Sequence, residues 1–246
     1  MKLKFFLTGN LILALSAGIN TVAAETLDLS ESAGKRAAQV MIVDTHIDVP
    51  YRMEEEWEDV TGGTQKGDFD YVRASAGGLN IPFMSIYTPP ESEAEGTSFQ
   101  LANQLIDSVE ALVGRAPGRF MMVKSPADAG AAMKQRKIGL AMGMENGSPI
   151  DGKLENLAYF RDRGISYITL THGLSNHISD SSYDDDKKWE GLSPIGKEVV
   201  TEMNRLGLMI DISHVSDQAF FQVIELSKAP VIASHSSARH FTPGWD

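Results

Sequence analysis

The sequence predicts an α/β fold, a (β/α)8 barrel of which this chain carries about six strands. Short apolar runs alternate with segments of helical periodicity along almost the whole chain. Most of these runs are too apolar to leave one face in water, so they suit a parallel sheet covered by helices. A barrel of eight strands typically takes ~250 residues, and here six expected strands already use the whole of residues 25–246.

Six short runs rich in large apolar residues are predicted to be the strands. The second of them follows Gly77-Gly78 and precedes Pro89-Pro90, which are turn-forming pairs. The charged, Gly-rich stretch 52–76 between the first two runs is predicted to be a loop. The expected strands are residues 39–44, 79–87, 138–144, 166–171, 208–213 and 230–234.

Five segments between or after these runs are predicted to be helices. Ser125 is placed to cap one of them, and Gly164 and Gly207 are placed to end two others. A polar stretch, residues 172–191, is expected to be a long loop. The expected helices are residues 98–113, 125–137, 154–163, 193–206 and 217–227.

Composition excludes several classes of protein and site. The chain has no cysteine, so disulfides, iron–sulfur clusters and thiolate zinc sites are excluded, and any metal must be held by His, Asp and Glu. The formal net charge is −11, which argues against a nucleic-acid partner, because such proteins need clustered Lys and Arg.

Residues 1–24 have the features of a secretory signal peptide. Lys2 and Lys4 precede an apolar stretch, and Val22 and Ala24 suit a cleavage site before Glu25. The alternative is a membrane anchor, but the apolar stretch is short for a span of ~20 residues. We expect a mature barrel domain, residues 25–246, without a stable membrane span. Export of a cysteine-free chain predicts a secreted protein, most simply one of a bacterial periplasm.

Metal-binding residue types recur after the predicted strands. In parallel α/β folds, the loops after the carboxyl ends of the strands build the functional site. His46 and Asp48 follow the first strand and are two residues apart, so both can point the same way. The other candidates at such ends are Glu145, His172, His214 and His235.

This pattern predicts a metal site. A carboxylate such as Glu145 can bridge two metal ions ~3.5–4 Å apart, and a nitrogen and oxygen ligand set suits zinc but also accepts manganese or cobalt. Taken singly, each histidine has a structural alternative as a hydrogen-bonded group near a strand end. The recurrence of these residues at one end of several strands favours the metal site, and with it hydrolytic chemistry.

Several motifs resemble those of the renal, or membrane, dipeptidases, which are zinc-dependent TIM-barrel enzymes of the metal-dependent hydrolase type. The similar segments occur in the family's order and cover residues 39–240. They include Val43 to Pro50, Gly143 to Gly147, Leu170-Thr171-His172, Asp211 to Ser216 and Ser234 to Arg239.

The resemblance implies a role for each candidate residue. His46 and Asp48 would bind one zinc ion, His214 and His235 the other, and Glu145 would bridge the two. A hydroxide between the metals would attack the peptide carbon of a dipeptide, often one with a D-residue at its C-terminal position. His172 would be a catalytic and substrate-binding residue at the scissile carbonyl. Family members are often dimers, so a homodimer is a further expectation.

The resemblance also implies two residues that the chain lacks, an Arg that holds the substrate carboxylate and a catalytic Asp on the last barrel strand. Arg239 stands too early to be that Arg. We therefore expect residues 25–246 to be a fragment of a longer reading frame, inactive and poorly stable by itself. Two alternatives stay open: another barrel amidohydrolase acting on lactams or lactones, or an inactive metal-binding remnant.

Overall fold

The computed structural model describes residues 33–37 and 39–242, and the chain divides into two units, Met1–Ile42 and Val43–Asp246. Residues 33–37 of the first unit form a short helix. The expected signal peptide, residues 1–24, lies outside the described residues. No helix of the described part is long and apolar enough to cross a membrane.

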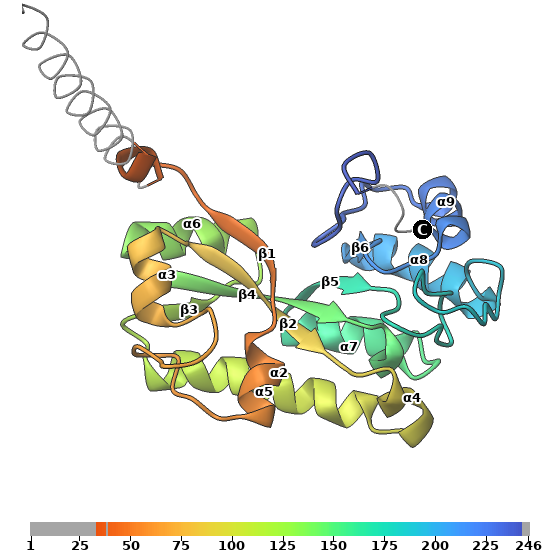
Figure 1. The fold of residues 1–246 in the computed structure, drawn as a ribbon, viewed down its shortest axis with the longest axis horizontal. Helices are drawn as coiled ribbons and strands as arrows, with labels where there is room; N and C mark the ends of the chain where they lie inside the picture. The colour runs from red at the N-terminus through yellow and green to blue at the C-terminus, as the bar shows by residue number, and fades with distance from the viewer. Residues whose placement is uncertain (1–32, 38, 243–246) are drawn as a thin grey trace, which may run out of the picture. The chain divides into compact units, whose positions relative to one another are not determined.

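The second unit is built on a curled parallel sheet, as predicted (Figure 1). The strand order is β1-β2-β4-β5-β6, and β3 pairs with the first half of β4. Every pairing between named strands is parallel, so the carboxyl ends of the strands meet at one edge. The strands are β1 Val43–Ile47, β2 Ile81–Tyr87, β3 Phe120–Met122, β4 Ile138–Glu145, β5 Ile165–Thr169 and β6 Met209–Asp211.

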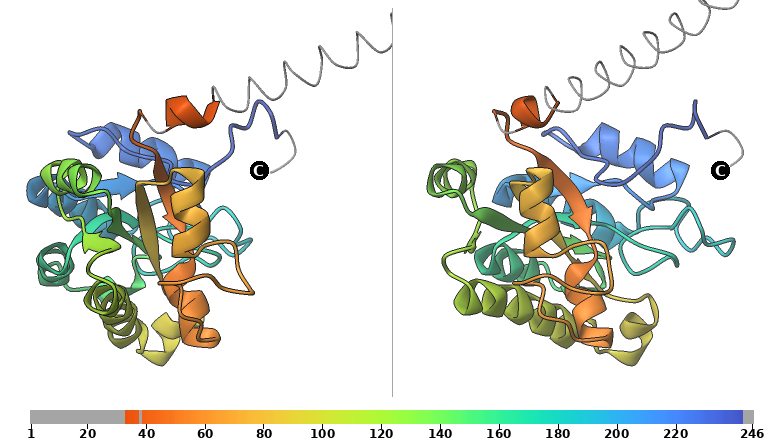
Figure 2. Two further views of the ribbon diagram at one scale, coloured as in Figure 1. Left: turned by 90° about the vertical axis from the view of Figure 1, so that its left-hand side faces the viewer. Right: turned by 60° about the vertical axis from the view of Figure 1, so that its left-hand side comes forward.

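Helices pack around the outside of this sheet (Figure 2). They are α2 Val49–Glu55, α3 Tyr71–Gly77, α4 Glu91–Glu95, α5 Ser98–Arg115, α6 Pro126–Gln135, α7 Glu155–Arg163, α8 Pro194–Leu206 and α9 Asp217–Leu226. The predicted helix cap and the two predicted helix ends are confirmed. Ser125 accepts a hydrogen bond from the backbone of Asp128 at the start of α6, and Gly164 and Gly207 end α7 and α8. The sequence therefore encodes most helix boundaries locally.

Four predictions about the elements were wrong or incomplete. The first strand, expected at residues 39–44, is Val43–Ile47, so it contains His46 instead of preceding it. The stretch 52–76 is not only a loop, because it holds the end of α2 and all but the last residue of α3, which Asp70 caps. The three-residue strand β3 was missed. Residues 230–234 form no named strand, and only Ile232 makes a bridge, to Asp211. Such short elements depend on their partners more than on their own apolar pattern.

Strand β4 is the buried centre of the sheet. All eight of its residues are buried, and the side chains of Leu140, Met142 and Met144 are in the core. The strand pairs with β2 along Phe83 to Tyr87 and with β5 along Ile165 to Thr169. Its last residue, Glu145, is thus held in place by two neighbouring strands.

Candidate metal centre

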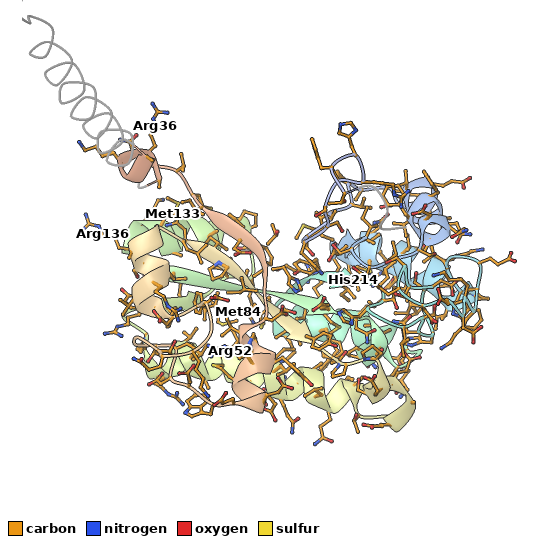
Figure 3. All side chains as sticks on the ribbon, viewed as in Figure 1. Arg36, Arg52, Met84, Met133, Arg136 and His214 are labelled. Carbon is orange, nitrogen blue, oxygen red and sulfur yellow. The ribbon has the colours of Figure 1, made fainter. Side chains whose placement is uncertain are left out.

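The structure brings the six candidate residues together at the carboxyl edge of the sheet. His46 lies in β1 and Asp48 directly after it, and Glu145 ends β4. His172 follows β5, His214 follows β6, and His235 follows the bridge at Ile232. Figure 3 shows His214 near this end of the strands, away from Arg136, which precedes β4.

Glu145 is the centre of the cluster. Its Oε1 lies 3.1 Å from Nε2 of His214 and 3.3 Å from Nε2 of His235. Its Oε2 lies 3.3 Å from Nε2 of His46, and that nitrogen is also 3.3 Å from Oδ1 of Asp48. The two oxygens of one buried carboxylate therefore face different sets of ligand atoms, which is the arrangement that a bridging ligand requires.

His172 lies at the margin of the cluster. Its Nε2 is 3.6 Å from Oε1 of Glu145, and its ring is in contact with the rings of Tyr87 and His214. Its Nδ1 is buried and has no hydrogen-bond partner among the described residues. Burial lowers the pKa of His172, although the charge of Glu145 opposes this. The imidazole is therefore neutral at neutral pH, and it stays accessible because 27% of its side chain is exposed.

The electrostatics of the cluster favour a cation. Burial lowers the pKa of His46, but hydrogen bonds to Asp48 and Glu145 outweigh it and raise the pKa to about 9. Burial raises the pKa of Glu145, but His214, His235 and His46 hold it far below its usual range. Without a metal ion, the site therefore keeps a proton on His46 next to an ionised Glu145.

The donor set fits a divalent metal. Imidazole nitrogens and carboxylate oxygens converge in two groups whose ligand atoms lie within 4.8 Å of one another, His46-Glu145-His235 and Glu145-His172-His214. The resemblance groups the residues differently, with His214 and His235 on one ion. Those two Nε2 atoms are also close, at 2.7 Å. Glu145 is common to every grouping, and this N and O set is one that zinc accepts.

Backbone strain is present at the same edge. His214 has φ of 68° and Asn146 has φ of 74°, although neither is glycine. A left-handed backbone costs a non-glycine residue on the order of 1 kcal/mol and is kept where the surroundings impose it. His214 is therefore held in a conformation that its own sequence does not favour.

Several residues that hydrogen-bond to the candidate ligands were not predicted from the sequence. Ser85 donates to Oε2 of Glu145, Tyr167 contacts Nδ1 of His46, and Ser234 contacts Nδ1 of His235. Asp211 accepts hydrogen bonds from Ser234. One sequence signal was available, because Asp211 is a lone carboxylate at the end of an apolar strand.

Zinc affinity is expected to rise with pH. Because the pKa of His46 in the metal-free site is about 9, a proton must leave before Nε2 can bind zinc. Below pH 9 this single proton makes the affinity rise about tenfold per pH unit, and above it the dependence flattens. Chelator competition between pH 6 and 10 measures the slope. An affinity independent of pH from 6 to 9 would contradict this expectation.

The fold and the convergent ligands define the class of protein, a parallel α/β barrel of the metal-dependent hydrolase type. The family model for membrane dipeptidase, peptidase family M19, matches residues 31–244. The chain belongs to this family.

Two solved structures and a curated relative are similar. The chain is 32% identical over 222 residues to an uncharacterized dipeptidase of Schizosaccharomyces pombe, covering 82% of this chain and 53% of that protein. The probable dipeptidase PvdM of Pseudomonas aeruginosa superposes with a TM-score of 0.77 at 26% identity, covering 85% of this chain and 56% of that one.

A metallo peptidase of Rhodobacter sphaeroides, liganded with a phosphinate mimic of the dipeptide L-Ala-D-Ala, superposes with a TM-score of 0.71 at 23% identity. It covers 82% of this chain and 66% of that one, and at this identity the likeness concerns the fold. The chain spans about half the length of the curated relative it matches.

Proposed function

We propose that the chain carries the metal centre of a binuclear zinc dipeptidase, in which a hydroxide held between the two ions hydrolyses the peptide bond of a dipeptide. The observation that carries this proposal is the position of Glu145, whose two oxygens face ligand nitrogens on both sides. Membership of the membrane dipeptidase family supports the reaction and the substrate class.

The roles proposed for the ligands are those that the resemblance implies, and several distances support them. His46 and Asp48 would hold one ion, since Nε2 and Oδ1 lie together beside Oε2 of Glu145. His214 and His235 would hold the other, since both Nε2 atoms face Oε1. The low pKa of Glu145 keeps its carboxylate ionised, so both oxygens are free to bind metal throughout the physiological pH range.

His172 is proposed to act on the substrate. Its neutral ring lies beside the cluster but farther from Glu145 than the ligand histidines do. With a proton on Nε2, it would donate a hydrogen bond to the scissile carbonyl oxygen as negative charge develops there. A neutral donor suits this task, since it would add no positive charge to a site whose residues would hold two cations.

Export is part of the proposal. The features of residues 1–24 support secretion into a bacterial periplasm. A homodimer, which the resemblance implies, is proposed as the assembly.

The proposal is tested with protein expressed from its complete open reading frame, stripped of metal and reloaded with zinc. We expect two zinc ions per chain and zinc-dependent turnover of L-Ala-D-Ala above that of lactone and β-lactam substrates. In His214→Ala, we expect one tightly bound zinc ion and loss of turnover. Full turnover by that variant, or faster lactone hydrolysis by the wild type, would refute the proposed activity.

A further inference from the structure

We infer that Tyr167 and the Asp211–Ser234 pair are positioning residues, which fix the proton of His46 and of His235 on Nδ1 and so leave each Nε2 free for metal. This inference rests on the proposed zinc site, and it concerns residues that hydrogen-bond to the candidate ligands without being ligands themselves.

Tyr167 sets the tautomer of His46. Its hydroxyl is 2.9 Å from the carbonyl oxygen of Thr45 and 3.0 Å from Nδ1 of His46. A carbonyl can only accept, so the hydroxyl donates its proton to Thr45 and accepts from Nδ1–H of His46. When the ring loses its other proton, Nε2 of His46 therefore carries the lone pair.

Ser234 does the same for His235. Its hydroxyl is 2.5 Å from Oδ2 of Asp211 and 2.7 Å from Nδ1 of His235. The serine donates its proton to Asp211, so its oxygen accepts from Nδ1–H of His235. The lone pair of His235 is therefore also on Nε2.

Several other hydrogen bonds hold Asp211 in place as the acceptor of the Ser234 hydroxyl. It is fully buried at the end of β6, and it accepts hydrogen bonds from the hydroxyl of Thr169 at 2.6 Å and from the backbone and hydroxyl of Ser213. The backbone of Ser234 donates to it as well. These donors join β5, β6 and the segment that carries His235, so the carboxylate fixes both the position of Ser234 and the direction of its hydroxyl hydrogen.

The consequence is a site prepared for cations. In the neutral imidazoles, each Nε2 would direct a lone pair toward an oxygen of Glu145 at 3.3 Å. A lone pair facing an anionic oxygen is unfavourable unless a proton or a metal ion lies between them. His214 differs, because its buried Nδ1 has no hydrogen-bond partner among the described residues. Two of the ligand histidines are thus oriented by hydroxyl groups before metal binds.

The test compares zinc affinities of Tyr167→Phe and Ser234→Ala, each of which removes only a hydroxyl. Loss of a group that orients a metal ligand typically weakens metal binding about 10–100-fold, and we expect a loss of this size in each variant. Two matched controls remove hydroxyls that bond away from the cluster, Tyr159→Phe and Ser98→Ala. They are expected to bind zinc like the wild type.

Further measurements separate orientation from general damage. Ser234→Thr keeps the hydroxyl and is expected to restore the affinity that Ser234→Ala loses. In zinc-loaded protein, the histidine nitrogen NMR signals are expected to show Nε2 bound and Nδ1 protonated for His46 and His235. If the wild type binds two zinc ions and both Tyr167→Phe and Ser234→Ala bind zinc as tightly as it does, the inference is overturned. A wild type that binds no zinc would instead refute the proposed function.

Discussion

Glu145→Gln is expected to lose tight binding of both zinc ions. The substitution keeps the size of the side chain but removes the charge, and one of the two oxygens becomes an amide group that cannot accept. Both groups of ligand atoms include this carboxylate, so neither site is left complete. Turnover is expected to fall on the order of 10³-fold or more, since bound metal contributes several kcal/mol of transition-state stabilisation.

The measurement is zinc stoichiometry by elemental analysis after gel filtration, with dipeptide turnover as the second readout. Glu93→Gln is the matched control, because Glu93 is also partly buried and paired with a histidine, His177, outside the cluster. The control is expected to keep two zinc ions per chain. Tight binding of two ions by Glu145→Gln would show that Glu145 does not bridge them.

Glu145→Gln is also expected to lower the stability of the fold. In the metal-free protein, Glu145 is surrounded by histidines whose charge and hydrogen bonds lower its pKa. A carboxyl group with a lowered pKa stabilises the fold above its unfolded pKa, and this contribution is lost as the pH falls through the folded value. Removing the charge therefore destabilises the metal-free chain at neutral pH as well as the loaded one.

The sequence was sufficient to predict the candidate ligands because of a regularity of parallel sheets. Strand ends meet at one edge, so residues 46, 145, 214 and 235, far apart in the chain, could be placed together by locating the end of each apolar run. The structure brings these residues and His172 around Glu145. Metal binding itself and the roles of the residues stay predictions.

The residues that hydrogen-bond to the candidate ligands could not be predicted in the same way. Tyr167 and Ser234 look like an ordinary aromatic strand residue and an ordinary serine, and their role depends on which side chain each meets across the sheet. The short strand β3 and helix α3 were missed for a related reason, since pairing and capping by distant or polar residues define them. Pattern reasoning finds the residues that carry the chemistry more readily than those that orient them.

Gly143→Ala is expected to destabilise the fold and to weaken zinc binding at His46 together. Gly143 pairs with Tyr167 across β4 and β5, and the ring of Tyr167 lies over the glycine. A Cβ at position 143 would be 2.0 Å from Cζ of Tyr167. The strand cannot yield because it is paired on both sides, so the ring must shift and carry its hydroxyl away from Nδ1 of His46.

Overpacking of this kind typically costs about 1–3 kcal/mol of unfolding free energy. The matched control is Gly130→Ala in α6, where a new Cβ meets nothing within 4 Å. It is expected to be neutral or to stabilise by roughly 0.5–1 kcal/mol, because alanine is the better helix former. Denaturant unfolding of the metal-free protein and zinc titration measure the two effects.

A double-mutant cycle shows whether the ring carries the effect. If Gly143 is required only because Tyr167 lies over it, Gly143→Ala should cost little stability in a Tyr167→Leu background, where no ring fills the space. The two substitutions would then be strongly non-additive, and Gly143→Ala would cause no further loss of zinc affinity. Additive losses would mean that Gly143 is needed for the backbone of β4 itself, and that the position of the Tyr167 hydroxyl does not depend on this glycine.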